Sequence, residues 1–267
     1  VTVDKYIVVS SDCHAGLPPE KYKDYLDPKF HQVFDQALPI QLLRNQQAEE
    51  SFLIKDINDA WRGENEKLLP GAWDYETRVK ILDTDGIAAE VIFADGVTER
   101  NSPPFGAGLG LPTRDIDPDM QWAGAHAHNR WLAELCANAP ERHVGVALVP
   151  LLWNIERAVD ELKWCADNGI KGVMIPIMTH QFEGYHHTRY HPFWEACEAL
   201  GIIVHFHSGG SNTHQYFGDK WPEESAEDYV GGMGVYVTEA MFWTYRPITF
   251  MIWGGVFENS SQRSVGG

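Results

Sequence analysis

The sequence predicts an α/β protein of the (β/α)8 barrel type in which about five of the eight strand–helix units are present. Two observations lead to this prediction. Short apolar runs rich in β-branched residues alternate with longer segments whose apolar residues recur at helical spacing. The strand-like runs are apolar almost throughout, as is typical of parallel strands in a sheet covered on both faces or in a barrel.

The first expected strand covers residues 5–11 and is followed by a long insertion over residues 15–73, which is rich in proline, glutamine and aromatic residues. Residues 75–86 are expected to form a helix because their apolar residues have helical spacing and the segment ends in a glycine, which favours a C-cap. A second strand is expected over residues 88–95, and a long helix over residues 118–140.

A third strand is expected over residues 143–151, followed by a helix over residues 153–169 with Asn154 as its N-cap. The alternation then continues with a strand, a helix and a fifth strand, over residues 171–177, 191–201 and 202–210. From residue 224 onward we expect helical segments that are interrupted by glycines and by Pro247.

The number of expected strands bears on the domain organisation. We expect residues 1–267 to form a single domain. Five strands and their connections occupy most of this length, and eight units at the same rate would need more than ~300 residues. We therefore expect the barrel to be truncated at its carboxyl end, so that the sequence is the first part of a longer enzyme, unless a partner chain supplies the missing strands.

Composition restricts the classes of partner and the compartment. The formal net charge of −17 argues against a nucleic acid or an anionic membrane as partner. No apolar run approaches the ~20 residues of a membrane span, and the first residues lack the basic region of a signal peptide. The four cysteines have no C-x-x-C spacing, which favours reduced thiols in a cytoplasmic protein. We expect a small-molecule substrate, and formation of a homo-oligomer stays open.

Polar residues at two strand ends predict a metal site. Asp12 and His14 lie just past the first strand, and His205 and His207 lie at the end of the fifth, each pair at the spacing that points to one face. A carboxylate and imidazoles suit zinc, manganese or iron. Alternatively, Asp12 is a turn residue and His14 its polar neighbour. The flanking apolar residues also fit His205 as a hydrogen-bonded histidine inside the barrel.

Other residues have weaker or different roles. His180 and Asp95, at the ends of the fourth and second strands, are expected to face the substrate together with His205. The "HAH" stretch at residues 126–128 lies in a helical pattern, so its two histidines point to different sides and should not chelate one ion. Cys13 should point away from the site because it lies between two inward-facing residues.

Five stretches carry a resemblance to a known family, in the order in which that family has them. The chain resembles the amidohydrolase superfamily, in particular amidohydrolase family 2, which includes metal-dependent hydrolases and non-oxidative decarboxylases of aromatic and related acids. The stretches are "VSSDCHAGLPPEKYKDYL", "GAWDYETRVKILDTDGIAAEVIFAD", "RHVGVALVPL", "HPFWEACEALGIIVHFHSGG" and "FMIWGGVFE".

The resemblance implies one divalent metal, zinc first and manganese or iron as alternatives. The family's strand-one H-x-H motif corresponds to Asp12 and His14, so an acid replaces the first histidine here. His207, directly before "SGG", matches the family's strand-five ligand. The family's strand-six histidine and strand-eight aspartate cannot be placed in this chain.

Three functions follow as alternatives. The first is hydrolysis of a small-molecule amide, ester or lactone by metal-activated water. The second is non-oxidative decarboxylation of an aromatic or related acid, in which the metal polarises and orients the substrate carboxylate. The third belongs to another class: a catalytically inactive, barrel-derived binding protein, which would differ from the enzymes in holding no metal.

Overall fold

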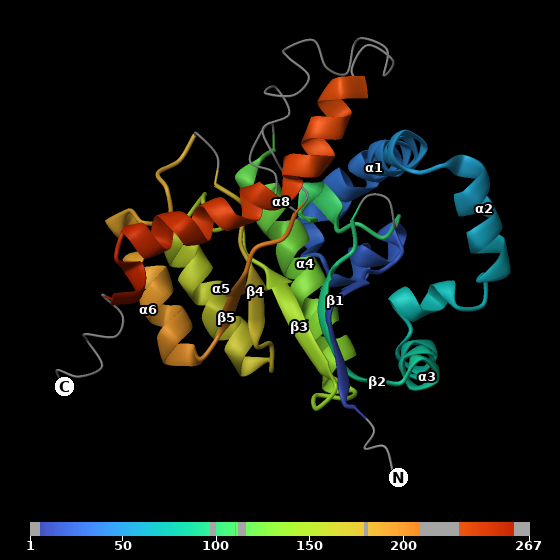
Figure 1. Ribbon diagram of the computed structural model, residues 1–267, viewed down its shortest axis with the longest axis horizontal. Coiled ribbons are helices and arrows are strands. Elements are labelled where there is room, and N and C mark those ends of the chain that lie inside the picture. The colour runs from blue at the N-terminus through green and yellow to red at the C-terminus, as the bar shows by residue number, and fades with distance from the viewer. Residues whose placement is uncertain are drawn as a thin grey trace.

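The fold is built on one sheet of five parallel strands in the order β1-β2-β3-β4-β5 (Figure 1). The computed structural model describes residues 6–96, 100–109, 111, 116–178, 181–208 and 230–258. The strands are β1 Val8–Ala15, β2 Ile87–Ala94, β3 His143–Leu148, β4 Gly172–Met174 and β5 Ile203–His205. Within these residues β1 and β5 are the two edges, so the sheet is an open, incomplete barrel, as the sequence predicts.

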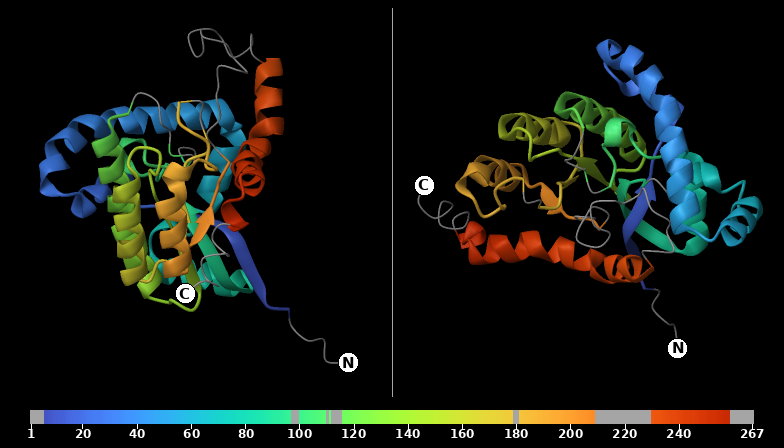
Figure 2. Two further views of the ribbon diagram at one scale, coloured as in Figure 1. Left: turned by 90° about the vertical axis from the view of Figure 1, so that its left-hand side faces the viewer. Right: turned by 90° about the horizontal axis from the view of Figure 1, so that it is seen from above.

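Helices cover both sides of this sheet. Figure 2 shows α4, α5 and α6 on one side and α8 running across the other. The α-helices are α1 His31–Phe52, α2 Lys55–Glu64, α3 Tyr75–Asp85, α4 Pro118–Ala137, α5 Ile155–Asp167, α6 His191–Leu200 and α8 Val230–Trp253. The short 3-10 helices are η1 Pro19–Tyr25, η2 Pro28–Phe30, η3 Leu69–Ala72, η4 Pro104–Gly106 and η5 Thr188–Tyr190.

Local capping signals place several helix ends where the sequence predicts them. Gly86 follows α3 with φ 72°, and Gly201 follows α6 with φ 64°, which is the left-handed conformation that glycine adopts readily. Asn154 precedes α5, and its side-chain oxygen accepts a hydrogen bond from the backbone N–H of Arg157 at 2.9 Å. These ends depend on chemistry within one turn of helix, which the sequence displays directly.

The first strand differs from the expectation. It was expected over residues 5–11 as a buried strand, but β1 spans Val8–Ala15, so Asp12 and His14 lie within the strand and not just past it. Val8 and Val9 are 49% and 55% exposed rather than buried. The physical reason is that β1 is an edge: β2 pairs with it on one side, and in the described part of the chain no strand pairs with it on the other.

Other element bounds also differ. The insertion over residues 15–73 contains two helices, α1 and α2, that the sequence analysis did not identify. The strands β4 and β5 have three residues each, fewer than the apolar runs around them. The segment beyond residue 230 is one helix, α8, which continues through Pro247 instead of breaking there. Figure 1 shows that α8 changes direction along its length, as long helices containing proline do.

The core lies between the sheet and helices α4, α5 and α6. Its fully buried members include Leu132 of α4, Val173 of β4, Leu162 of α5 and Phe193 of α6. Packing is close at Gly145, where an added Cβ would lie 2.9 Å from the Cys136 sulfur, so that a neighbouring side chain would have to move. Among the described residues, no helix has the length and apolar character needed to cross a membrane.

Candidate metal centre

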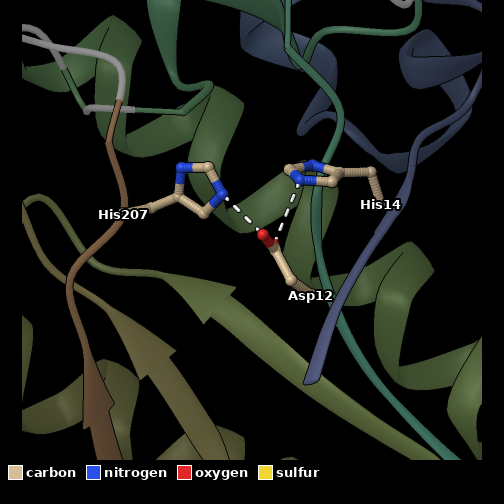
Figure 3. Close-up of side chains that lie close together, drawn as sticks. All are labelled: Asp12, His14 and His207. Carbon is tan, nitrogen blue, oxygen red and sulfur yellow. Dashed lines mark hydrogen bonds and ion pairs between the residues drawn. The ribbon is translucent and has the colours of Figure 1, made fainter. Parts of the chain in front are cut away.

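Three side chains from the two sheet edges meet at the carboxyl end of the strands (Figure 3). Asp12 and His14 lie on β1, and His207 lies two residues beyond β5. The Asp12 Oδ1 atom is 3.4 Å from His14 Nε2 and 3.3 Å from His207 Nε2. One ligand-type atom of each residue lies within 4.8 Å of the other two. The curvature of the sheet therefore brings together residues that are 195 positions apart in sequence.

An irregularity in β1 shapes this cluster. Between Ser10 and Cys13, the register of β1 against β2 leaves two residues of β1 facing the single residue Val91. Such a β-bulge interrupts the ladder and redirects a side chain, and bulges are common beside functional sites. Asp12 lies in the bulge, outside the regular pairing, and its exposed carboxylate extends toward both histidines.

Backbone carbonyls fix the orientation of both imidazole rings. His14 Nδ1 lies 2.8 Å from the carbonyl oxygen of Ala94, and His207 Nδ1 lies 2.5 Å from that of Ser208. A carbonyl oxygen only accepts hydrogen bonds, so each Nδ1 carries the proton and donates. In the neutral rings, each Nε2 then presents its lone pair on the side where Asp12 lies. Metal-binding histidines usually have this arrangement.

The donor set and its spacing fit a divalent metal. Charge-assisted N–H···O bonds are usually ~2.7–2.9 Å long, shorter than the 3.3 and 3.4 Å distances from Asp12 Oδ1 to the two histidines. In contrast, two ligands that each lie ~2.1 Å from one ion at a tetrahedral angle are about 3.4 Å apart. One carboxylate oxygen and two imidazole nitrogens suit zinc, manganese or iron.

An aromatic ring packs beneath the histidines. Phe93 of β2 is 5% exposed, and its ring centroid lies 6.1 Å from that of His14, 5.0 Å from that of His207 and 5.5 Å from that of His205. His205 does not join the cluster among the described residues. Its Nε2 packs against Gly172 of β4, and burial lowers its pKa. A substrate-facing role for His205 stays a prediction.

The other two residues expected to face the substrate are Asp95 and His180. Asp95 follows β2 and is 2% exposed, and its backbone N–H donates to the Ala15 carbonyl at 3.0 Å. It therefore lies beneath the surface at the end of the sheet, and its contact with substrate stays a prediction. His180 lies outside the described residues.

The "HAH" histidines and Cys13 are placed as their spacing predicts. His126 Nδ1 lies 2.9 Å from the Glu161 carboxylate, whereas His128 is buried with its Nδ1 3.0 Å from the Tyr22 hydroxyl. The two rings thus have different partners. Cys13 does not join the metal cluster; burial raises the pKa of its thiol, which donates to the Ser10 hydroxyl at 3.0 Å.

One buried ion pair beside β1 was not predicted. Arg78 of α3 donates from Nε and Nη2 to the two carboxylate oxygens of Glu90 at 2.6 and 2.7 Å. Its Nη1 donates to the backbone carbonyls of His14 at 3.1 Å and Gly71 at 3.0 Å. The sequence held one signal for it, since Glu90 interrupts the apolar strand "IAAEVIFA" and a buried carboxylate requires a partner.

Comparison with known proteins gives a family and a set of relatives. The family model described as amidohydrolase matches residues 88–252. A gamma-resorcylate decarboxylase from Rhizobium sp. (strain MTP-10005) is 26% identical over 174 residues, which cover 61% of this chain and 47% of the relative. The chain spans about half the length of the curated relatives that it matches.

Solved structures share the fold at low identity. An amidohydrolase from Mycobacterium avium subsp. paratuberculosis has a TM-score of 0.63 and 16% identity, with 97% of this chain and 71% of the other covered. A 5-carboxyvanillate decarboxylase from Novosphingobium aromaticivorans, solved with manganese and a nitrobenzoic acid, has a TM-score of 0.50 and 15% identity, with 98% and 71% covered. Because the matched residues 88–252 make up more than half of the chain, this protein belongs to the amidohydrolase family.

Proposed function

We propose that this chain provides the metal centre of a non-oxidative decarboxylase that acts on an aromatic carboxylic acid. The observation that carries the proposal is the meeting of Asp12, His14 and His207, with both Nε2 atoms beside one carboxylate oxygen. In this proposal the three side chains hold a single divalent ion at the carboxyl end of the sheet.

The comparisons favour decarboxylation over the hydrolysis that the sequence alone placed first. The curated relatives at 26–27% identity are gamma-resorcylate decarboxylases. A 2,6-dihydroxybenzoate decarboxylase from Rhizobium also shares the fold, with a TM-score of 0.53. We therefore take a hydroxylated benzoic acid as the substrate class.

Manganese is our first choice of ion. The 5-carboxyvanillate decarboxylase that shares this fold holds manganese. Zinc, which the sequence analysis placed first, has no comparable support. The donor set of one oxygen and two nitrogens accommodates either ion, because imidazole and carboxylate ligands bind both.

The reaction breaks the bond between the ring carbon and the carboxylate. Carbon dioxide leaves, and the ring carbon takes up one proton in its place. When bound, the ion would polarise and orient the substrate carboxylate. The chain's own contribution is to hold the two imidazoles: their Nδ1–H groups donate to backbone carbonyls, and Phe93 packs against both rings.

Manganese binding and carbon dioxide release together test the proposal. Titration of the purified chain with Mn²⁺, followed by the electron paramagnetic resonance signal of the free ion, should give about one site per chain. The variants His14→Asn and His207→Asn should each weaken binding by at least about tenfold. His187→Asn is the matched control because His187 is exposed and lies outside the cluster.

The position of the acid allows a sharper comparison. Asp12→Asn keeps the side-chain shape but loses the charge, so it should weaken Mn²⁺ binding without unfolding the protein. Asp12→His restores the commoner H-x-H pattern and should keep the metal. Carbon dioxide release from 2,6-dihydroxybenzoate is then measured on the loaded wild type. Metal binding combined with turnover only of amides or lactones would replace decarboxylation with hydrolysis. No metal and no turnover would favour the inactive binding protein.

A further inference from the structure

We propose that Arg78 is a positioning residue of the metal centre, which fixes the backbone of His14 through its ion pair with Glu90. This inference rests on the proposed metal site. Arg78 is not a member of the donor cluster, so it acts through His14 rather than on the ion.

The ion pair has the geometry that a buried charge pair needs. Arg78 is 7% exposed and Glu90 is 1% exposed. The guanidinium donates to both oxygens of Glu90, and His143 Nδ1 lies 2.9 Å from one of them. Removing two charges from water costs several kcal/mol unless such contacts compensate. An apolar pair of residues would fill the same space without that desolvation cost. The remaining hydrogen bonds of the ion pair therefore indicate its role.

Those remaining contacts bridge the bulge in β1. Glu90 of β2 is paired with Ser10, the residue before the bulge, whereas His14 lies after it and is paired with Phe93. Through its Nη1 atom, Arg78 connects the Glu90 side chain to the carbonyl oxygen of His14. The side chain thus spans the stretch in which the backbone ladder between the two strands is interrupted.

The same arginine attaches the long insertion to this point. Its Nη1 also donates to the carbonyl of Gly71 in η3, and the backbone N–H of Gly16 donates to the Ala72 carbonyl at 3.0 Å. The insertion therefore returns against the end of β1 directly beside His14. Since β1 is an edge strand in the described sheet, these contacts supply support that a neighbouring strand supplies elsewhere.

Replacing the guanidinium by an ammonium separates positioning from charge. Arg78→Lys keeps one positive charge, but a single nitrogen cannot reach the carboxylate and both carbonyls together. The matched control is Arg142→Lys. Arg142 donates to the backbone carbonyls of Ala88 and Ile87 at 3.0 Å and pairs with an aspartate, but it does so at the opposite end of β2.

The test measures Mn²⁺ affinity and the paramagnetic resonance spectrum of the bound ion, at a temperature where circular dichroism shows each variant to be folded. Arg78→Lys should weaken Mn²⁺ binding by about 10- to 100-fold, the usual effect of removing an outer-shell support, and should broaden the spectrum. Arg142→Lys should stay within about twofold of the wild type. If Arg78→Lys does not fold, Glu90→Gln replaces it, with a loss in the same direction expected.

Two results would overturn the inference while leaving the metal site in place. One is wild-type Mn²⁺ affinity in folded Arg78→Lys or Glu90→Gln. The other is an equal loss of affinity in Arg142→Lys, which would mean that the effect is general destabilisation. If the wild type itself bound no Mn²⁺, the proposed function and this inference would fail together.

Discussion

Acid should destabilise this protein through His128, by an amount set by the burial of its imidazole. His128 of α4 is fully buried. Its Nδ1 lies 3.0 Å from the Tyr22 hydroxyl, and its Nε2 has no hydrogen-bond partner within the described residues. Burial lowers the pKa of His128 from 6.5 to about 3. In that range the unfolded chain binds a proton that the folded protein does not.

The sign and size of the effect follow from proton linkage. Where the unfolded state binds more protons, the free energy of unfolding rises with pH, so it falls as the pH drops below 6.5 and stops falling near pH 3. Each pH unit inside this window corresponds to about 1.4 kcal/mol for one site. Between pH 7 and pH 5 the loss from His128 alone is about 2 kcal/mol, a sizeable part of the ~5–15 kcal/mol that stabilises a typical domain.

Equilibrium unfolding in urea at pH 7 and pH 5 measures this loss. The comparison variant is His128→Asn, whose side-chain amide can face the Tyr22 hydroxyl but does not titrate. The wild type should lose about 2 kcal/mol more than the variant between the two pH values, with equal denaturant slopes. If both proteins lost the same free energy, His128 would not be the group that resists protonation in the folded state.

Three further substitutions should lower the free energy of unfolding in the same urea assay. In Gly124→Ala the added Cβ would lie 2.1 Å from the Pro104 carbonyl oxygen, so α4 must shift, at a cost of about 1–3 kcal/mol. Unchanged stability would mean that η4 can move away from α4 without a cost in free energy. Asn129→Leu removes both hydrogen bonds to the backbone of Leu148, at 2.9 and 2.7 Å, and should cost about 1–3 kcal/mol for each group left unpaired; a neutral result would require another partner. Asp74→Ala removes the N-cap of α3 and should cost about 1 kcal/mol, whereas Asp74→Asn should cost much less.

The parts of the fold that depend on neighbouring residues could be predicted from the sequence. Gly86 and Asn154 mark helix ends because capping acts within one turn. Helix α1 could not be predicted, because Pro39 lies inside it and its apolar residues have little helical periodicity. Its stability comes from tertiary contacts such as that of Phe34, whose ring packs edge-on against Phe105 at 6.2 Å. No pattern within residues 31–52 predicts that contact.

The same distinction holds in the candidate site. Asp12, His14 and His207 could be selected because ligand-type residues at strand ends are visible in the sequence. The bulge that holds Asp12 could not, because it is a property of the pairing between two strands. The sequence does show Glu90 as an acid within an apolar strand, which indicates a buried carboxylate that needs a partner. Its partner Arg78 depends on which face of α3 meets β1 and β2, and that is set by packing.

The two halves of the proposed site are supported unequally, which bears on how metal and fold would influence each other. His14 is held by the Ala94 carbonyl, by pairing with β2 and by Arg78, whereas the bond that orients the His207 ring goes to the adjacent residue Ser208. The separation of the halves depends on the curvature of the whole sheet, because they come from its two edges. An ion bound to both would cross-link those edges and stabilise the folded state by about 2.7 kcal/mol at a hundredfold excess over its Kd. Because these contacts already hold β1 in place, the conformation of β1 should vary little. The metal affinity should therefore depend mainly on the conformation of the segment that carries His207.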